Sequence, residues 1–565
     1  MIDLRLYRIT LLPALAAVAV LMFSLGSLPD PKRSRLAPNA FDGDRAAATA
    51  TELARLAPDR RPGSAGNGRV ADFVRQRFDA IQGGEVTEQR FDGDFRGDRV
   101  RMRNVVLTLH GQSDRRVALI AHRDEGAGSG LASSAASTAT LLEIASSFSG
   151  STHSKTLVFV STDGGSAAAV GARRFGDAYP GNEQLEAIIS VEQPGAARPR
   201  PPFVIPWSAG SENTAIQLTR SAQTAVRDEV GKPTGQLGPW GQLVQLALPS
   251  GLGEQSVLVR QGYDAVSISS AGERPLAEGA TGPASFSAES VGEFGRAALS
   301  LMLALDASTR PLEHGPSAYV GVAGNLLPGW TLRLLALILI LPVAAASVDG
   351  AARALRRDMR LPGSVSWVAG RSLPFVAALA AAYLLALVTA LPSPDFPFDS
   401  RDYGFGWPET LSALVMLAAF LAAARGVSRL GPAAGGPEVV SVAVALIMSV
   451  AVVLLWLLNP YLALLLLPAL HLWQVGAVPP VPQGPLVAAG AVAAGLALPV
   501  AALAQLGDRL DLGALDGAMA WNLLLMVTGG HMGTAKMLLL CVVAGCAVAT
   551  IGAGLAHRRE PGVRL

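Results

Sequence analysis

Cysteine is almost absent from this 565-residue chain: there are two, Cys541 and Cys546, and both lie in the last apolar segment. The region before the apolar segments therefore has neither a disulfide framework nor a cysteine-ligated zinc site. A region of about 280 residues can bury a core large enough to fold without disulfides. The lack of disulfides is thus compatible with a domain outside the cytoplasm.

Charge is also scarce. Charged residues make up 16% of the chain and hydrophobic residues 50%, whereas a typical soluble domain carries about 25% charged residues. Much of the chain must therefore lie in lipid. The 46 Lys and Arg nearly balance the 44 Asp and Glu. Because no basic stripe interleaved with aromatic residues is present, the composition argues against nucleic-acid binding.

A nearly continuous apolar run at residues 9–25 follows Arg5 and Arg8. It is long for the hydrophobic part of a signal peptide, so it favours a retained signal anchor within residues 1–33. A signal peptide that is cleaved near Ser24 is the alternative.

Residues 34–315 alternate short apolar strands with helical patterns. This alternation predicts an α/β domain with a mostly parallel sheet. The predicted strands are 86–91, 104–109, 117–121 and 156–160, and the predicted helices are 69–78, 135–148, 167–175 and 284–305.

Residues 326–565 contain repeated apolar segments, which predict an all-α polytopic transmembrane bundle of seven or eight helices. The candidate spans are 330–347, 373–391, 410–424, 439–458, 461–473, 486–506, 518–528 and 535–555. Two of them, 461–473 and 518–528, are short for a bilayer that needs about 20 helical residues.

The loops between these spans differ in charge, and the charge predicts the orientation. Arginines follow the first and third spans (Arg353, Arg356, Arg357, Arg360, Arg371; Arg425, Arg429), and aspartates follow the second (Asp395, Asp399, Asp402). By the positive-inside rule, the arginine-rich loops are cytoplasmic. The α/β domain is then outside the plasma membrane. The basic tail, residues 557–564, also favours the cytoplasm, which leaves the exact number of spans open.

Short motifs follow one another in a fixed order through the α/β region: RRPGS at 60–64, VALIAHRD at 117–124, LLEIA at 141–145, DG at 163–164 and GARRF at 171–175. In this order and spacing they resemble the dinuclear-zinc aminopeptidase family, zinc exopeptidases of the aminopeptidase S and glutamate carboxypeptidase type. The resemblance implies a zinc-exopeptidase-like three-layer sandwich. It also implies where a metal site would lie.

By this resemblance, His122 matches the family's first metal ligand and Asp124 the carboxylate that orients it. Glu192 matches a later acidic ligand. His122 and Glu192 are thus the metal ligands that the resemblance retains. The family's final histidine has no counterpart in residues 267–278.

Three further positions of the family's site have lost their chemistry. Ser133 takes the place of the aspartate that bridges the two metals, and Gly165 and Ser166 take the place of a glutamate pair, base and ligand. A neutral hydroxyl cannot bridge two dications, and glycine cannot accept a proton. Hydrolysis by the two-zinc route is therefore not expected, and no cofactor is expected unless the peptidase interpretation holds, in which case it is zinc. The nearby carboxylates Glu125 and Asp163 are expected to be solvated.

Three hypotheses follow. The first is a non-catalytic membrane protein, a pseudoenzyme that binds a protein, peptide or lipid-linked partner at the outer membrane face. The second is an active membrane-bound metallo-aminopeptidase with unusual ligands. The third is a transporter or lipid-handling component, with the α/β domain as an accessory and polar residues such as Asn459 or His471 in the membrane.

Overall fold

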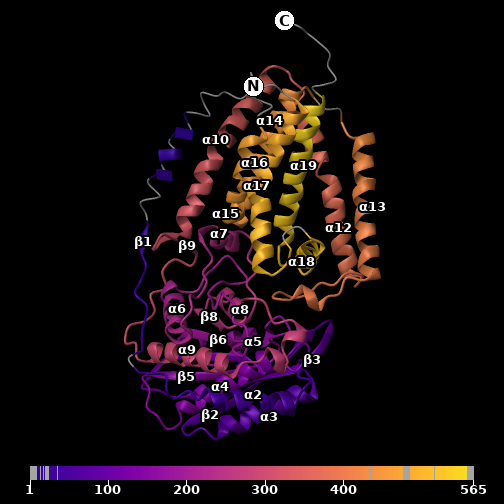
Figure 1. The fold of residues 1–565 in the computed structure, drawn as a ribbon. Coiled ribbons are helices and arrows are strands. Elements are labelled where there is room, and N and C mark those ends of the chain that lie inside the picture. The colour runs from indigo at the N-terminus through magenta and orange to yellow at the C-terminus, as the bar shows by residue number, and fades with distance from the viewer. Residues whose placement is uncertain are drawn as a thin grey trace.

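A computed structural model of the chain describes residues 25–34, 36–432, 435–474, 484–513 and 516–556, with isolated positions between 9 and 19. The anchor expected within residues 1–33 lies largely outside the described residues, and so does the basic tail. An α/β domain occupies one end of the molecule and a region of long helices the other (Figure 1).

The middle layer of the α/β domain is a seven-stranded sheet. In chain order its strands are β2 (Gly84–Phe95), β3 (Asp98–Leu109), β4 (Ser113–His122), β5 (Lys155–Thr162), β6 (Leu185–Glu192), β7 (Val204–Ile205) and β8 (Ala265–Ser269). Their spatial order is β2-β3-β5-β4-β6-β8-β7. The four central strands, from β5 to β8, are parallel, as the sequence predicts, whereas the pairings β2–β3, β3–β5 and β7–β8 are antiparallel. The sheet is therefore mixed.

Helices cover both faces of the sheet, which makes the predicted three-layer sandwich. One face packs against α2 (Gly43–Leu56), α3 (Ala65–Asp79), α4 (Ala136–Ser147), α6 (Ile216–Val230) and α9 (Ala288–Asp306). The other packs against α5 (Val170–Ala178) and α8 (Glu254–Arg260).

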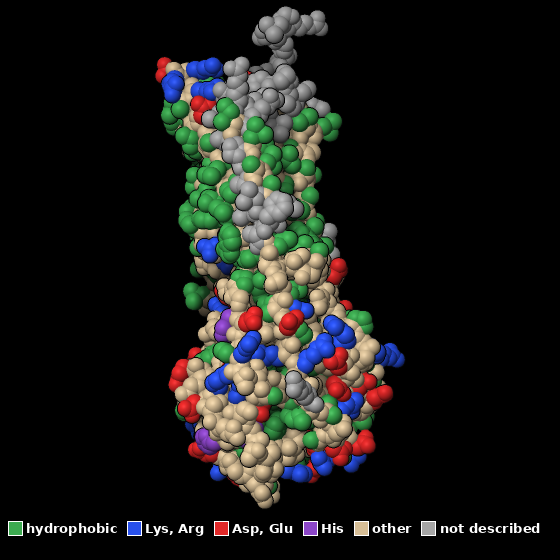
Figure 2. All heavy atoms as spheres, turned by 90° about the vertical axis from the view of Figure 1, so that its left-hand side faces the viewer, with side chains coloured by type: hydrophobic (Ala, Val, Ile, Leu, Met, Phe, Trp, Pro, Cys, Tyr) green, Lys and Arg blue, Asp and Glu red, His purple; other side chains and the backbone are tan. Residues whose placement is uncertain are grey.

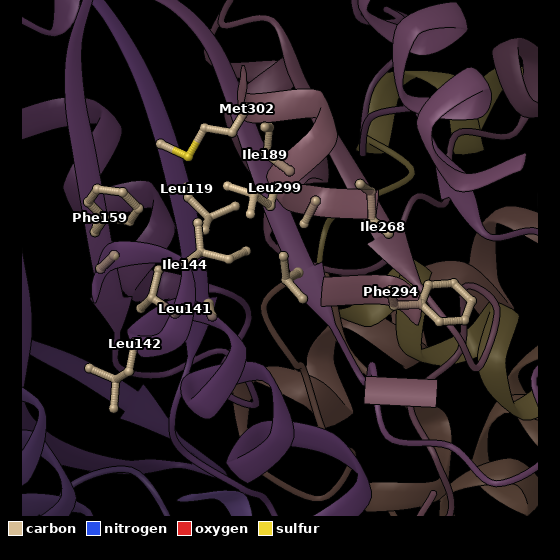
Figure 3. Packing of buried hydrophobic residues seen from close by; sticks show 14 of the residues in the cluster. Leu119, Leu141, Leu142, Ile144, Phe159, Ile189, Ile268, Phe294, Leu299 and Met302 are labelled. Carbon is tan, nitrogen blue, oxygen red and sulfur yellow. The ribbon is translucent and has the colours of Figure 1, made fainter. Parts of the chain in front are cut away.

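Side chains alternate along the central strands because successive residues of a strand point to opposite faces. Leu119 of β4 and Phe159 of β5 belong to the core beneath α4 and α9, where Figure 3 shows them close to Ile144. Their neighbours Ile120 and Val160 belong to the smaller core beneath α5 and α8.

The predicted strands and helices all occur, with shifted ends. The helix expected at 167–175 begins at Val170, because Ala168 and Ala169 have positive φ angles of 54° and 51° and cannot continue a right-handed helix. The helix expected from residue 284 begins at Ala288, where the Ser287 side chain accepts the N–H of Ser290 and caps it.

Six helices among the described residues are long and apolar enough to cross a membrane, which indicates a multi-pass membrane protein. They are α10 (Gly329–Arg356), α11 with α12 (Leu361–Gly370 and Leu373–Leu387), α13 (Trp407–Leu430), α14 (Pro437–Leu458), α17 (Pro485–Arg509) and α19 (Thr534–Ala556). The two spans noted as short are short here as well: one is broken into α15 (Pro460–Leu465) and α16 (Leu467–Leu472), and the other is α18 (Gly517–Thr528). The hydrophobic surface of this region contrasts with the charged surface of the α/β domain (Figure 2).

The broken segment belongs to a section of chain that passes from one end of the helical region to the other. Helix α14 ends beside the α/β domain, where the Asn459 amide donates to the Leu246 and Ala247 carbonyls at 3.2 and 3.1 Å. Helix α17 begins at the opposite end, where a Cβ on Gly554 near the end of α19 would meet Pro485. Among the described residues, the chain leaves α14 at the end beside the α/β domain and begins α17 at the opposite end, so these two ends together with the six long spans imply seven passages through the helical region.

The two parts of the molecule are joined by buried polar contacts. Arg509, at the end of α17, lies 3.3 Å from the Glu273 carboxylate, and both side chains are buried. A small sheet of β1 (Gly26–Ser27), β10 (Asn325–Pro328) and β9 (Tyr319–Val322) leads directly into α10. Helix α7 (Pro239–Ala247) contacts α15 and α17.

Candidate functional site

The candidate site lies at the carboxyl ends of the central parallel strands, where ligands bind in many open α/β sheets. His122 is the last residue of β4, and Glu192 is the last residue of β6. Both line a cleft of about 370 Å³, together with Asp124, Glu125 and Ser133. The structure thus brings together the residues that the sequence singled out, because adjacent parallel strands end at the same edge.

His122 forms part of the cleft wall. Its Nδ1 is buried and has no hydrogen-bond partner among the described residues. Burial alone would lower the pKa of His122, but the carboxylates of Asp124, Glu254, Glu192 and Glu125 raise it above its usual value. The imidazole is therefore surrounded by negative charge.

Gly165 packs directly against this imidazole. A Cβ atom at position 165 would lie 2.5 Å from both Cβ and Cγ of His122, closer than two carbon atoms can approach. The position where the resemblance places a catalytic glutamate therefore has no room for any side chain while His122 keeps this conformation.

Asp124 has a different role from the one expected. Its carboxylate accepts the backbone N–H groups of Gly165 and Ser166, each at 2.8 Å, and the Ser166 hydroxyl at 2.6 Å. It has no hydrogen bond with His122 among the described contacts. Asp124 therefore does not orient His122 as expected. The oxygens of Asp124 instead hold the turn at residues 165–166, whose free N–H groups need an acceptor.

Ser133 is already engaged by a neighbouring acid. Its hydroxyl donates to Glu125, which also accepts the Ser134 hydroxyl at 2.8 Å. The buried guanidinium of Arg60 donates to the Ser134 oxygen at 2.8 Å. Glu125 is therefore not a free solvated carboxylate, and a fixed positive charge lies next to it.

Asp163 also differs from expectation. It is 2% exposed and pairs with the buried Arg123 guanidinium at 2.8 Å, while the Asn67 amide donates to it at 2.6 Å. The expectation of a solvated loop carboxylate is wrong here, because a buried arginine needs a countercharge.

Glu254 is the residue of this site that sequence reasoning missed. It begins α8, is 1% exposed, and lines the cleft beside Glu192, which accepts its backbone N–H at 3.0 Å. One carboxylate oxygen accepts the Thr162 hydroxyl, and the other has no partner among the described residues. Burial raises the pKa of Glu254 to about 7. A glutamate in the first turn of a helix is common, so its sequence carries no signal of this role.

A loop from the helical region forms part of the cleft wall. Residues 396–402, which we call the roof loop, connect α12 to α13 and contribute Phe398, Asp399 and Arg401 to the cleft wall. Asp399 pairs with Arg274 of the α/β domain at 2.9 Å. The sequence predicts an external acidic loop here but does not indicate that it covers the site.

The described residues do not fit a pair of zinc ions. No three His, Cys, Asp or Glu side chains in the described part of the chain are placed to hold a metal ion. Such a pair needs a bridging carboxylate and further imidazole and carboxylate ligands. Here the nearest equivalent of the bridge is a serine hydroxyl donating to Glu125, and His122 is the single histidine of the cleft.

Residues 104–238 match the sequence profile of peptidase family M28. The α/β domain is an M28-like domain. A comparison with curated proteins found no match. The M28-like domain is also similar to several solved structures.

Among those structures is a glutaminyl cyclase from an Acidobacteriales bacterium, with 15% identity and a TM-score of 0.37, over 49% of this chain and 97% of that chain. Another is a leucine aminopeptidase precursor from Bacteroides thetaiotaomicron, with 14% identity and a TM-score of 0.38, over 46% and 97%. A third is a Zn-dependent exopeptidase from Parabacteroides distasonis, with 14% identity and a TM-score of 0.37, over 49% and 99%.

Proposed function

We propose that the M28-like domain is a non-catalytic binding module that holds a peptide, protein or lipid-linked partner in the cleft at the outer membrane face. The observation that carries this proposal is the contact between Gly165 and His122. The resemblance places a catalytic carboxylate at this position, where the chain has glycine, and the histidine that would bind a metal fills the space. The pocket is then shaped for contact rather than for proton transfer.

The contacts of Ser133 support the same proposal. Its hydroxyl and that of Ser134 converge on Glu125, so the group at the bridging position is committed to an internal hydrogen bond. Introducing two dications next to Arg60 would require this network to open and two cations to approach a fixed guanidinium.

The orientation belongs to the proposal too. The arginine-rich loops after α10 and α13 lie at the end of the helices away from the M28-like domain, whereas the acidic roof loop lies beside it. By the positive-inside rule this supports a cytoplasmic far end and an M28-like domain outside the plasma membrane.

The first experiment measures metal and turnover. The full chain, purified in a neutral detergent, is assayed for zinc by elemental analysis and for hydrolysis of aminoacyl anilides. We expect substoichiometric zinc and no hydrolysis above background. Stoichiometric zinc together with turnover that is lost in His122→Ala would overturn the proposal.

The second experiment separates binding from catalysis in cells that lack the protein. Ala127 lines the cleft. The substitution Ala127→Trp therefore fills the cleft and leaves all of its ionisable side chains in place. We expect Ala127→Trp to fail to restore the phenotype of cells that lack the protein, whereas the nearly isosteric Glu254→Gln and the surface control Ala307→Trp restore it. Loss of function in Glu254→Gln with a correctly folded protein would contradict a non-catalytic role.

One observation favours a second candidate, a hydrolase with unusual groups. Glu254 and His122 lie in one cleft, and a carboxyl group with a pKa of about 7 is suited to proton transfer near neutral pH. The anilide assay decides between the two candidates, because this enzyme would lose turnover in Glu254→Gln. The transporter hypothesis gains no support: Asn459 caps α15 and His471 lies 3.0 Å from the Leu339 carbonyl, so both have structural contacts.

A further inference from the structure

A second cavity, of about 460 Å³, lies on the other side of the M28-like domain from the roof loop, against the segment at residues 28–33. We call it the Arg33 cavity. Its walls are this segment, one face of α6, the loop before α7 together with Gln242 and Gln245 of α7, and strand β9. It shares no lining residue with the cleft described above, so this inference is independent of the proposed function.

Three arginines line the Arg33 cavity, against one acid, Asp30. Arg220 and Arg227 are seven residues apart and therefore project from the same face of α6. That face also presents Thr219, Gln223 and Thr224 to the cavity, and no acid. The lining thus carries an excess of positive charge and several hydrogen-bonding side chains.

The guanidinium groups are available to a ligand. Those of Arg33 and Arg227 have no hydrogen bond or ion pair with any described residue, and both side chains are exposed. Arg220 donates one N–H to the Pro29 carbonyl, which holds the segment in place. Guanidinium groups present a planar fork of donors that matches the oxygens of a phosphate.

The rest of the lining is apolar. Leu28, Trp207, Leu237 and Tyr319 contribute to the same cavity. A ligand that used the whole space would therefore have an anionic end and an apolar body.

The Arg33 cavity lies close to the helical region. Gln245, in its wall, accepts a hydrogen bond from Arg509 at the end of α17. The segment at 28–33 follows β1, which pairs with β10 just before α10. Figure 2, which faces this side, shows Lys and Arg side chains on the M28-like domain below the hydrophobic surface of the helices. The phosphates of phospholipids lie near the ends of membrane spans, and arginine side chains at that level match their oxygens.

We propose that the Arg33 cavity binds a phosphate ester through Arg33, Arg220 and Arg227. The phosphate could reach it from a lipid headgroup or from a soluble phosphate ester, and the chemistry of recognition is the same. A carboxylate carries at most one negative charge, whereas a phosphate monoester carries about two at neutral pH and so matches the charge of this lining better.

The test uses the full chain in a neutral detergent and measures affinity for three probes: dihexanoyl phosphatidic acid, glycerol 3-phosphate and dihexanoyl phosphatidylcholine. The variant is Arg33→Gln with Arg227→Gln, because neither side chain supports the fold and the Arg220–Pro29 contact is kept. The matched control is Arg174→Gln with Arg198→Gln, which removes the same charge from exposed positions outside the cavity.

We expect phosphatidic acid to bind more tightly than phosphatidylcholine, and the cavity variant to lose about tenfold or more in affinity while the control keeps it. Tighter binding of phosphatidic acid than of glycerol 3-phosphate identifies a lipid as the source; equal binding identifies a soluble ester. Failure of both phosphate monoesters to bind, or equal losses in the cavity variant and the control, would overturn the proposal.

Discussion

The buried carboxyl group of Glu254 makes the stability of the M28-like domain depend on pH. Burial raises the pKa of Glu254 to about 7, against the opposing effects of His122 and the Thr162 hydroxyl. Between the usual glutamate pKa and this value, the folded chain holds a proton that the unfolded chain has released. Stability from this group is therefore lost as the pH rises through the interval.

We predict that Glu254→Gln stabilises the protein at pH 8 and flattens the dependence of melting temperature on pH between about 4.5 and 7. The amide keeps an acceptor for Thr162 without a buried charge, and the gain is at most about 3 kcal/mol. Thermal unfolding of the full chain across this pH range measures it. The exposed Glu183→Gln is the control, and an unchanged slope in Glu254→Gln would contradict the assignment. Some slope remains, because the pKa of His122 is also raised and its stabilisation is likewise lost with rising pH.

Some residues of the site could be predicted from the sequence and others could not. His122 and Glu192 could be located because they end predicted strands, and parallel strands end at one edge. Glu254 comes from a separate helix more than 60 residues beyond Glu192, with no motif around it. The contact between Gly165 and His122 depends on a three-dimensional fit that composition does not encode.

At the level of elements, the roof loop couples the cleft to the helices. Asp399 and Arg274 are 8% and 7% exposed, and the Arg274 guanidinium also donates to the Leu510 and Asp511 carbonyls. Although burial tends to raise it, the pKa of Asp399 is lowered by hydrogen bonds from Arg401 and Arg274. The ionised carboxylate is thus the form that the loop requires.

We predict that Asp399→Ala destabilises the full chain by about 3–5 kcal/mol, because it leaves a buried guanidinium without its countercharge. The double variant Asp399→Leu with Arg274→Met should lose less, since both charges are removed together. Thermal unfolding and limited proteolysis of the loop measure the effect. The exposed Asp395→Asn serves as control. A double variant that is less stable to unfolding than Asp399→Ala would contradict the pairing.

The elements themselves were largely predictable, because hydrophobic periodicity is local. Strands such as β4 and β5 contain continuous runs of apolar residues that are buried. The long helices can be located from the length of their apolar segments. Two features were not. The antiparallel edge strand β7 has only two residues, and the contact of the roof loop with the cleft joins segments more than 120 residues apart.

At the scale of the whole molecule, the charge of the loops and the passage of the chain agree. From the M28-like domain, the seven passages derived above carry the chain to the end of the helical region away from that domain. The arginine-rich loop after α10 and the described end of α19 then lie at the same end, which supports the proposed orientation.

This arrangement predicts which positions a reagent outside the cell can reach. Cys541 and Cys546 are buried, so a membrane-impermeant maleimide should label the unaltered chain weakly, and an introduced cysteine will dominate the signal. Arg198→Cys, in the M28-like domain, should be labelled in intact cells. Arg357→Cys, just beyond α10, should be labelled only after lysis, because the hydrocarbon layer separates the two positions. Labelling of Arg357→Cys in intact cells, with Arg198→Cys protected, would place the cleft in the cytoplasm. It would contradict the proposal that the partner is bound at the outer membrane face.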